Sequence, residues 1–240
     1  KRQEYEDCIL FYRLGDFYEM FFDDAIKASK ELEITLTGKD CGLSERAPMC
    51  GVPFHSASVY IAKLIEKGYK VAICEQVEDP KTAKGIVKRE VIRVVTPGTV
   101  VDEELLDEKN NNYLAVIYSQ SDKYGFAVSD ISTGEIYTTE ISGADEALNE
   151  IARYEPKEIL LNSDAAEKLS AQVELRFHIT PDECTDDFFE NSEFEKNILQ
   201  QFGKNSLSEI ALDTKPYAVR AVGAMTVSYT HLTLPTNREV

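Results

Sequence analysis

Three strand-like runs follow one another directly in the middle of the chain, and this succession constrains the fold more than any other feature. The runs are YLAVIYSQ (113–120), YGFAVSDI (124–131) and GEIYTTEI (134–141). Residues typical of turns separate them, which predicts an antiparallel meander. A helical run at 145–154 and a strand-like run at 158–162 follow. We therefore expect a mixed sheet flanked by helices.

The first hundred residues predict another mixed α/β domain. A set of apolar residues recurs at helical spacing and predicts a helix that begins at its first member: Phe17, Phe21, Ala25, Ala28 and Leu32. In this interpretation Asp16 caps the helix and Glu19 completes a capping box. A second helix is predicted between Ser56 and Gly68. β-Branched and apolar runs predict strands at 9–14, 34–38, 69–77 and 89–97.

The composition changes near residue 97 and divides the chain. The turn-forming TPGT (96–99) leads into a polar, acidic stretch. We therefore expect a first domain at 1–97, a linker at 98–111 and a truncated second domain at 112–224. The helical pattern of KPYAVRAVGA stops at Met225, where a Thr-rich stretch begins. This change predicts that residues 225–240 are a tail foreign to the natural sequence.

The charge of the chain is unevenly distributed. Lys and Arg nearly balance Asp and Glu over residues 1–100, so the net charge of −17 lies almost entirely in residues 101–240. The net charge argues against a generally basic nucleic-acid binder, but its distribution changes this interpretation, because the first half is balanced and contains a basic segment. The basic segment KTAKGIVKRE (81–90) is most simply a solvated loop. The chain has no long apolar run, no secretory leader and an odd number of scattered cysteines, which predicts a cytoplasmic protein without a membrane partner.

Motifs of common enzymes are missing. The sequence has no GxxxxGK[ST], GxSxG, HExxH or CxxC, so no catalytic residue, metal site or cofactor is predicted, and Cys50 with His55 has only proximity in its favour. A Mg²⁺-dependent nuclease on the second domain stays open as an alternative. It needs Asp130 to converge with other carboxylates on two metal ions. The run at 113–120 has no carboxylate, and PDECTDDFFE (181–190) is typical of a loop and a helix start.

The motif GDFYE (15–19) has two interpretations. Helical periodicity makes Phe17 a core residue. Alternatively, an exposed Phe is a rigid apolar wedge that enters between stacked bases, at the lowest cost where a mismatch already weakens stacking. Glu19 would be repelled by phosphates, so beside DNA it fits only as a partner of a base edge.

Four segments together carry a resemblance to a known family. They are LFYRLGDFYEMFFDDA, PMCGVPFHSASVYIAKLIEKGYKVAICEQVEDP, KREVIRVVTPGT and LDTKPYAVRAVGA. They extend from about residue 5 to residue 224. Through them the chain resembles the N-terminal part of the MutS family of bacterial DNA mismatch repair proteins.

The resemblance implies a mismatch-recognition domain followed by a ribonuclease-H-like connector domain. It implies that Phe17 stacks on the mispaired base and that Glu19 hydrogen-bonds to this base. It also assigns Lys39 and Arg93 to positions near DNA. The implied partners are mismatched double-stranded DNA, MutL at the connector domain and, in the full-length protein, a second copy.

The resemblance also bounds the activity. In the full-length family, ATP and Mg²⁺ bind to an ATPase domain that is not in this chain. The chain is therefore expected not to be an enzyme and not to hold a cofactor. A protein-interaction module without DNA binding is a further alternative, as in relatives that lack the Phe-x-Glu pair. The presence of Phe17 and Glu19 argues against it.

Overall fold

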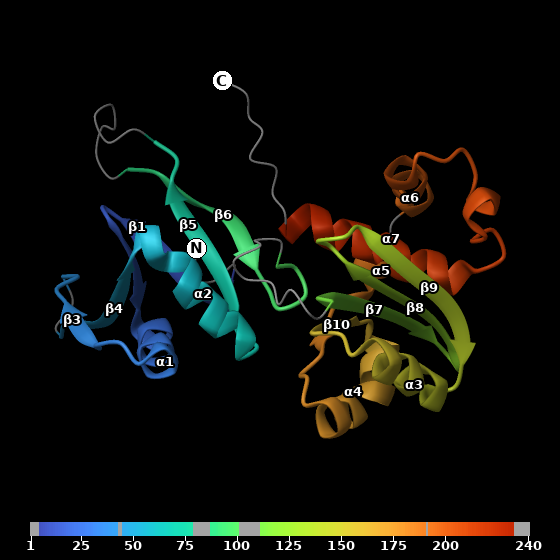
Figure 1. The fold of residues 1–240 in the computed structure, drawn as a ribbon, viewed down its shortest axis with the longest axis horizontal. Helices are drawn as coiled ribbons and strands as arrows, with labels where there is room; N and C mark the ends of the chain where they lie inside the picture. Colours follow the sequence, from blue (N-terminus) through green and yellow to red (C-terminus); the bar gives the residue numbers. More distant parts are fainter. Residues whose placement is uncertain (1–4, 43–44, 79–86, 101–110, 191, 233–240) are drawn as a thin grey trace. The chain divides into compact units, whose positions relative to one another are not determined.

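The structure is a computed structural model that describes residues 5–42, 45–78, 87–100, 111–190 and 192–232 (Figure 1). The chain divides into two compact units, one built on Lys1–Pro97 and the other on Gly98–Val101 and Leu106–His231. Most of the expected linker, and most of the basic segment 81–90, lies outside the described residues. No helix within the described ranges is both long and apolar enough to cross a membrane.

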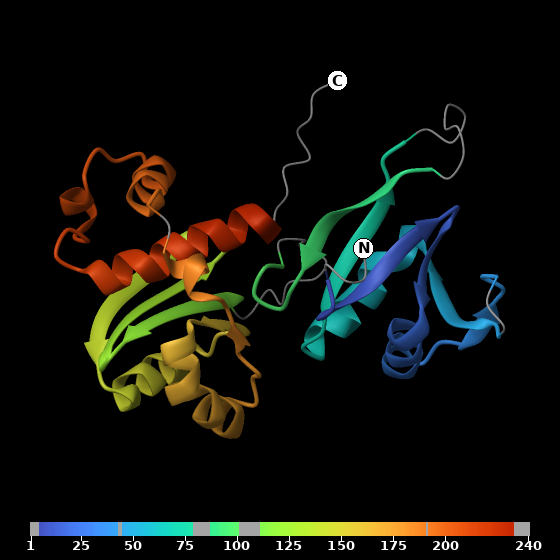
Figure 2. The same cartoon turned by 180° about the vertical axis from the view of Figure 1, so that it is seen from behind.

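The first unit is a six-stranded sheet in the order β3-β4-β2-β1-β5-β6. Strands β1 and β5 are parallel, and the other neighbouring pairs are antiparallel. Helices α1 (Phe22–Leu32) and α2 (Ala57–Glu66) contact each other and lie against the sheet (Figure 2). The strands are β1 (Cys8–Leu14), β2 (Phe17–Phe21), β3 (Thr37–Lys39), β4 (Ala47–Pro53), β5 (Lys70–Gln76) and β6 (Arg89–Val95).

The helix predicted from Phe17 is wrong over its first turn. Residues 17–21 form β2, which pairs with β1 on one side and β4 on the other. Tyr18 and Met20 are buried while Phe17 is exposed, so the burial follows the period of two that strands have. A spacing of four residues fits both periods, which explains the error. Helix α1 begins at Phe22, so the predicted capping box does not form.

Strand β4 was not predicted, and β3 lies further along the chain than the predicted strand at 34–38. β4 contains Pro48 and ends at Pro53, and proline cannot donate to a sheet ladder. Its register is set from both sides, by β3 and by β2. Tertiary pairing therefore creates a strand that the local sequence does not favour.

The second unit has the predicted meander and mixed sheet. Strands β7 (Tyr113–Gln120), β8 (Lys123–Asp130) and β9 (Glu135–Ser142) are antiparallel. Strands β10 (Glu158–Leu161) and β11 (Asp182–Glu183) extend the sheet in parallel with β7, in the order β11-β10-β7-β8-β9. The sheet thus consists of three antiparallel strands, and parallel strands continue it beyond β7. This order agrees with the expected ribonuclease-H-like arrangement.

Helices cover both faces of this second sheet (Figure 1). Helices α3 (Ala144–Tyr154) and α4 (Ser163–Phe177) pack on one face over residues such as Ile117 and Phe126. The other face holds Leu114, Val116 and Tyr118, which pack against a second group of helices. These are α5 (Asp186–Phe189), α6 (Phe194–Phe202) and α7 (Pro216–Leu232), with a 3₁₀ turn, η4, at Leu207–Ile210.

The helical pattern does not end at Met225 as predicted, because α7 continues to Leu232. Its buried residues include Ala218, Val222, Met225 and Ser228, which recur at the helical spacing of three or four residues. Met225 and Ser228 therefore extend the buried stripe. Residues 233–240 lie outside the described part, and the foreign origin of 225–240 stays a prediction.

The start of α7 is fastened to the sheet at two points. The backbone amides of Tyr217 and Ala218 donate to Glu140 Oε1 on β9, at 2.6 and 3.1 Å. A carboxylate at this end of a helix is stabilised by the positive end of the helix dipole. At Gly125 on β8, an added Cβ would lie 1.9 Å from the carbonyl oxygen of Tyr217. The helix can lie this close because Gly125 has no side chain.

We expect Gly125→Ala to destabilise the second unit by about 1–3 kcal/mol or more, since the atom that it meets is backbone and cannot rotate away. Urea unfolding followed by circular dichroism measures this change. Leu175→Ala is a matched control, because Leu175 is 72% exposed on α4 and its loss changes stability by about 0.5 kcal/mol or less. Equal effects of the two substitutions would contradict the close packing of α7.

Candidate nucleic-acid interface

The turn between β1 and β2 presents Phe17 to solvent. Gly15, at φ +58°, and Asp16 form this two-residue turn, and the left-handed backbone at Gly15 favours glycine. Phe17 follows as the first residue of β2, opposite Leu14 on β1 and Pro53 on β4. Its side chain is 47% exposed. The core interpretation of Phe17 is therefore wrong, because Tyr18 and Met20 fill the buried face of β2.

Glu19 lies on the same face of β2 as Phe17, two residues further along. Its Oε2 is 2.5 Å from the Nζ of Lys39 on β3. The Lys39 ammonium is also 5.6 Å from the centre of the Phe21 ring, so its side chain reaches over Phe21 to Glu19. The structure thus brings Phe17, Glu19 and Lys39 together on one face, and Lys39 neutralises a carboxylate that would repel phosphate.

Arg93 does not join this group. It lies on β6, opposite Ile73 on β5, and Ile73 is in turn opposite Phe11 on β1. Phe11 is fully buried on the face that the helices cover, whereas its neighbour Tyr12 is opposite Glu19. Alternation along the strands therefore places Arg93 on the other face of the sheet from Phe17 and Glu19.

Two residues near the turn were missed in the sequence. The Arg13 guanidinium lies over the ring of Phe54, 3.8 Å from its centre, and Arg13 Nε donates to the carbonyl of Gly15 at 2.6 Å. Phe54 is 42% exposed, and its ring meets His55 edge-on at 5.8 Å. An Arg inside an otherwise apolar strand, CILFYRL, was the available signal for the first of them.

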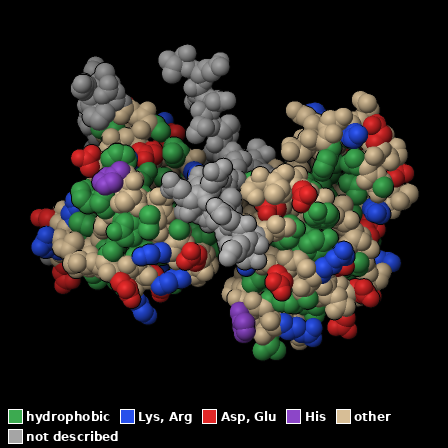
Figure 3. Space-filling model, viewed as in Figure 1, with side chains coloured by type: hydrophobic (Ala, Val, Ile, Leu, Met, Phe, Trp, Pro, Cys, Tyr) green, Lys and Arg blue, Asp and Glu red, His purple; other side chains and the backbone are tan. Residues whose placement is uncertain are grey.

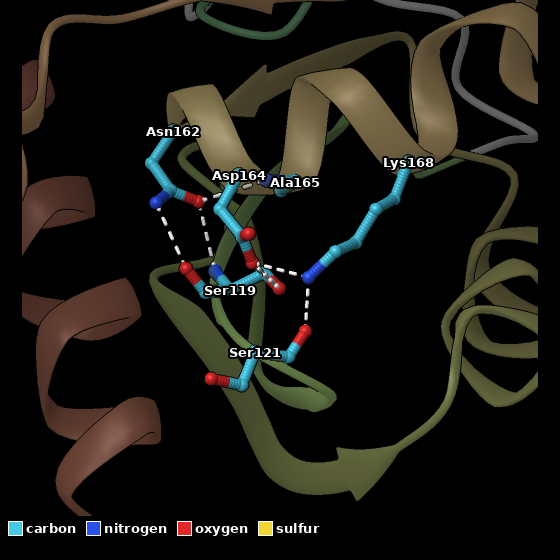
Figure 4. A network of polar contacts seen from close by, with 6 residues as sticks. All are labelled: Ser119, Ser121, Asn162, Asp164, Ala165 and Lys168. Carbon is cyan, nitrogen blue, oxygen red and sulfur yellow. Dashed lines mark hydrogen bonds and ion pairs between the residues drawn. The ribbon is translucent and has the colours of Figure 1, made fainter.

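The second unit has its own polar site at the carboxyl ends of β7 and β10, where ligands bind in open α/β sheets. Here the position is occupied by the chain itself (Figure 4). Asn162 Oδ1 accepts from the Ser119 amide at 2.8 Å, and Asn162 Nδ2 donates to the Ser119 carbonyl at 2.9 Å. Asp164 accepts from Ser119 Oγ at 2.6 Å and pairs with Lys168 at 2.5 Å. Lys168 also donates to the Ser121 carbonyl.

Asp130, on which the nuclease alternative depends, is engaged in the turn after β8. Its Oδ1 accepts from the amide and the hydroxyl of Ser132, at 2.9 and 2.6 Å. Its Oδ2 accepts from the amide of Asn112 at 3.0 Å. Across the described part of the chain, no three His, Cys, Asp or Glu residues are grouped so that they could hold a metal ion. The convergence that this alternative needs is therefore not found there.

The visible face of the molecule has no single-sign patch that would explain binding by charge alone (Figure 3). Acidic and basic side chains are interspersed on each unit in this view.

Comparison with family models resolves the relationship of the chain. The model of MutS domain I matches residues 1–104, and the model of MutS domain II matches residues 112–238. The chain belongs to the MutS family.

Relatives named DNA mismatch repair protein MutS agree with this assignment. The chain is 54% identical to the one from Acetivibrio thermocellus over 217 residues, which cover 88% of this chain and 25% of that protein. It is 52% identical to the one from Ruminiclostridium cellulolyticum over 231 residues, 93% of this chain and 26% of that protein. The chain therefore spans about a quarter of the length of the MutS proteins that it matches. The Phe17 turn lies within MutS domain I, and the Asn162–Asp164–Lys168 network lies within MutS domain II.

The network in MutS domain II predicts a pH dependence. Burial raises the pKa of Asp164, but hydrogen bonds from Lys168 and Ser119 and the Lys168 charge outweigh burial, so the pKa lies below its ordinary value of 3.8. A carboxyl group with a lowered folded-state pKa stabilises the fold above its unfolded pKa. This contribution is lost as the pH falls through the folded pKa. We therefore expect Asp164→Asn to destabilise the chain at pH 7, by about 1 kcal/mol or less because the pair is partly exposed.

The difference in unfolding free energy between Asp164→Asn and the unchanged chain should shrink as the pH falls below the ordinary carboxyl range. Urea unfolding over a series of pH values measures it. Glu167→Gln, at an exposed position of the same helix, is the matched control. A difference that stays constant from neutral to acidic pH would show that the charge of Asp164 does not stabilise the fold.

Proposed function

We propose that this chain recognises mismatched double-stranded DNA in mismatch repair, with Phe17 as an aromatic wedge that stacks on the mispaired base. The observation that supports this most is the exposure of a Phe at the start of β2, directly after a two-residue turn. An apolar side chain at a tip can enter between base steps from the minor groove. Membership of the MutS family and the names of the relatives agree with a role in DNA mismatch repair.

Energetics assign the wedge to discrimination. One base–aromatic stack contributes about 1–3 kcal/mol, and unstacking a base step costs a few kcal/mol. Phe17 alone therefore cannot hold a duplex. It favours sites where stacking is already weak, while phosphate contacts supply the affinity that does not depend on sequence.

Glu19 and Lys39 act together in this proposal. Glu19 accepts a hydrogen bond from the mispaired base, and Lys39, which is 2.5 Å from it in the free chain, offsets its repulsion of the DNA phosphates. Lys39 is 40% exposed, so it can also reach a phosphate. Arg93 lies on the other face of the sheet and does not act beside Phe17.

The remaining roles concern the longer protein. We propose that the full-length protein binds ATP and Mg²⁺ in a separate ATPase domain, forms a homodimer and contacts MutL through its second unit. The acidic second half of the chain supports a surface that meets protein, because it repels phosphate. No catalytic step is assigned to this chain, and its own site requires no cofactor.

The test of the wedge is fluorescence anisotropy at low salt with a G·T-mismatched duplex and the matched duplex. We expect the chain to prefer the mismatch and Phe17→Ala to lose about 1–3 kcal/mol of binding to the mismatched duplex alone. Val59→Ala is the control, because Val59 is also exposed (57%) but lies on α2. A mismatch preference that survives in a folded Phe17→Ala variant would contradict the wedge.

The Lys39 contact predicts a change in salt dependence. If Lys39 meets a phosphate in the complex, Lys39→Met makes the negative slope of log K against log salt less steep by about 0.9. Titration of the matched and mismatched duplexes at several salt concentrations measures this slope. Folding stability should change by about 1 kcal/mol or less, since the ion pair is partly exposed. An unchanged slope would mean that Lys39 stays paired with Glu19 on DNA.

A further inference from the structure

The two carbonyl groups of the β1–β2 turn are each held by a donor. The Gly15 carbonyl accepts from Arg13 Nε at 2.6 Å. The Asp16 carbonyl accepts from the backbone amide of Phe54 at 3.0 Å, and Phe54 follows directly after β4. The turn that precedes Phe17 is therefore fixed from its own hairpin and from the neighbouring strand.

Arg13 joins these contacts into one unit. Its side chain is only 19% exposed, and its guanidinium lies 3.4 Å from Glu75 on β5, 3.8 Å from the centre of the Phe54 ring and 5.6 Å from that of Tyr18. The Tyr18 hydroxyl donates to the same Glu75 carboxylate. Arg13 thus connects the turn, the core side of β2, β5 and the segment after β4.

Only an arginine can make this set of contacts together. A guanidinium is planar and stacks on an aromatic face while its N–H groups donate in fixed directions. A lysine ammonium at the same place could keep the ion pair with Glu75 but not the stack on Phe54. The stack covers one face of the Phe54 ring, which is 42% exposed.

We propose that Arg13 is a positioning residue for Phe17: stacked on Phe54, it locks the Gly15–Asp16 turn and holds the Phe17 ring ready to stack. This inference rests on the proposed role of Phe17 in mismatch recognition. A flexible turn would have to become ordered when DNA binds. The entropy lost in that ordering weakens binding. Because Phe17 contributes the energy of only one stack, a loose turn would remove most of its discrimination. Arg13 itself need not touch DNA.

Hydrogen–deuterium exchange tests, without DNA, whether Arg13 holds the Gly15–Asp16 turn in place. In Arg13→Met we expect the Phe54 amide, which donates to Asp16, to exchange about tenfold faster or more, while the amides of α1 keep their rates. Arg13→Lys should give an intermediate increase. Lys67→Met is the control, because Lys67 forms an ion pair with Glu31 at 2.9 Å in the same unit and has no contact with the turn.

Duplex binding by the same variants tests positioning. We expect Arg13→Met to reduce the mismatch preference while its binding to the matched duplex stays within about twofold, and Lys67→Met to keep the preference. Faster exchange throughout the unit, or an unchanged exchange rate of the Phe54 amide, would show that Arg13 does not specifically hold the turn in place. A loosened turn with a full mismatch preference would overturn positioning. If the unchanged chain shows no mismatch preference, the proposed function fails, and the exchange rates still decide whether Arg13 locks the turn.

Discussion

The double ladder of β2, paired with β1 on one side and β4 on the other, is the constraint on which the recognition surface depends. It fixes Phe17 opposite Leu14 and Pro53. A slip of one residue would exchange the two faces of the strand and place Phe17 in the core. The register therefore makes Phe17 a surface residue, and it places Glu19 on the same face.

Polar side chains support an exposed aromatic surface in the first unit and fill the end of the sheet in the second. In the first, Phe17 and Phe54 are exposed at one end of the sheet, and charged residues organise the turn between β1 and β2. In the second, the carboxyl ends of β7 and β10 are filled by Asn162, Asp164 and Lys168. Closing that position with internal hydrogen bonds stabilises the fold and leaves no open group of metal-binding carboxylates among the described residues.

The sequence predicts the three antiparallel strands of the second sheet well, because each is eight residues long and turn residues separate them. It misses the short strand β11, which lies in a run typical of a loop and a helix start. It fails at residues 17–21, where spacing by four fits helix and strand equally and pairing with β1 and β4 decides between them. It also fails at β4, whose prolines disfavour a strand, and at α7, whose stripe continues through Met225 and Ser228. Phe17, Glu19 and Lys39 come from the family resemblance, whereas the contact between Arg13 and Phe54 is seen only in the geometry of the turn.

Contact between the Phe17 ring and the mispaired base is the central claim, and nuclear Overhauser effects measure it directly. The complex of the chain with a G·T-mismatched duplex, at low salt and high concentration, should give effects between the Phe17 ring protons and protons of the mispaired base. The matched duplex should give none. Effects that link the Phe17 ring only to protons of its own domain, in both complexes, would contradict the account.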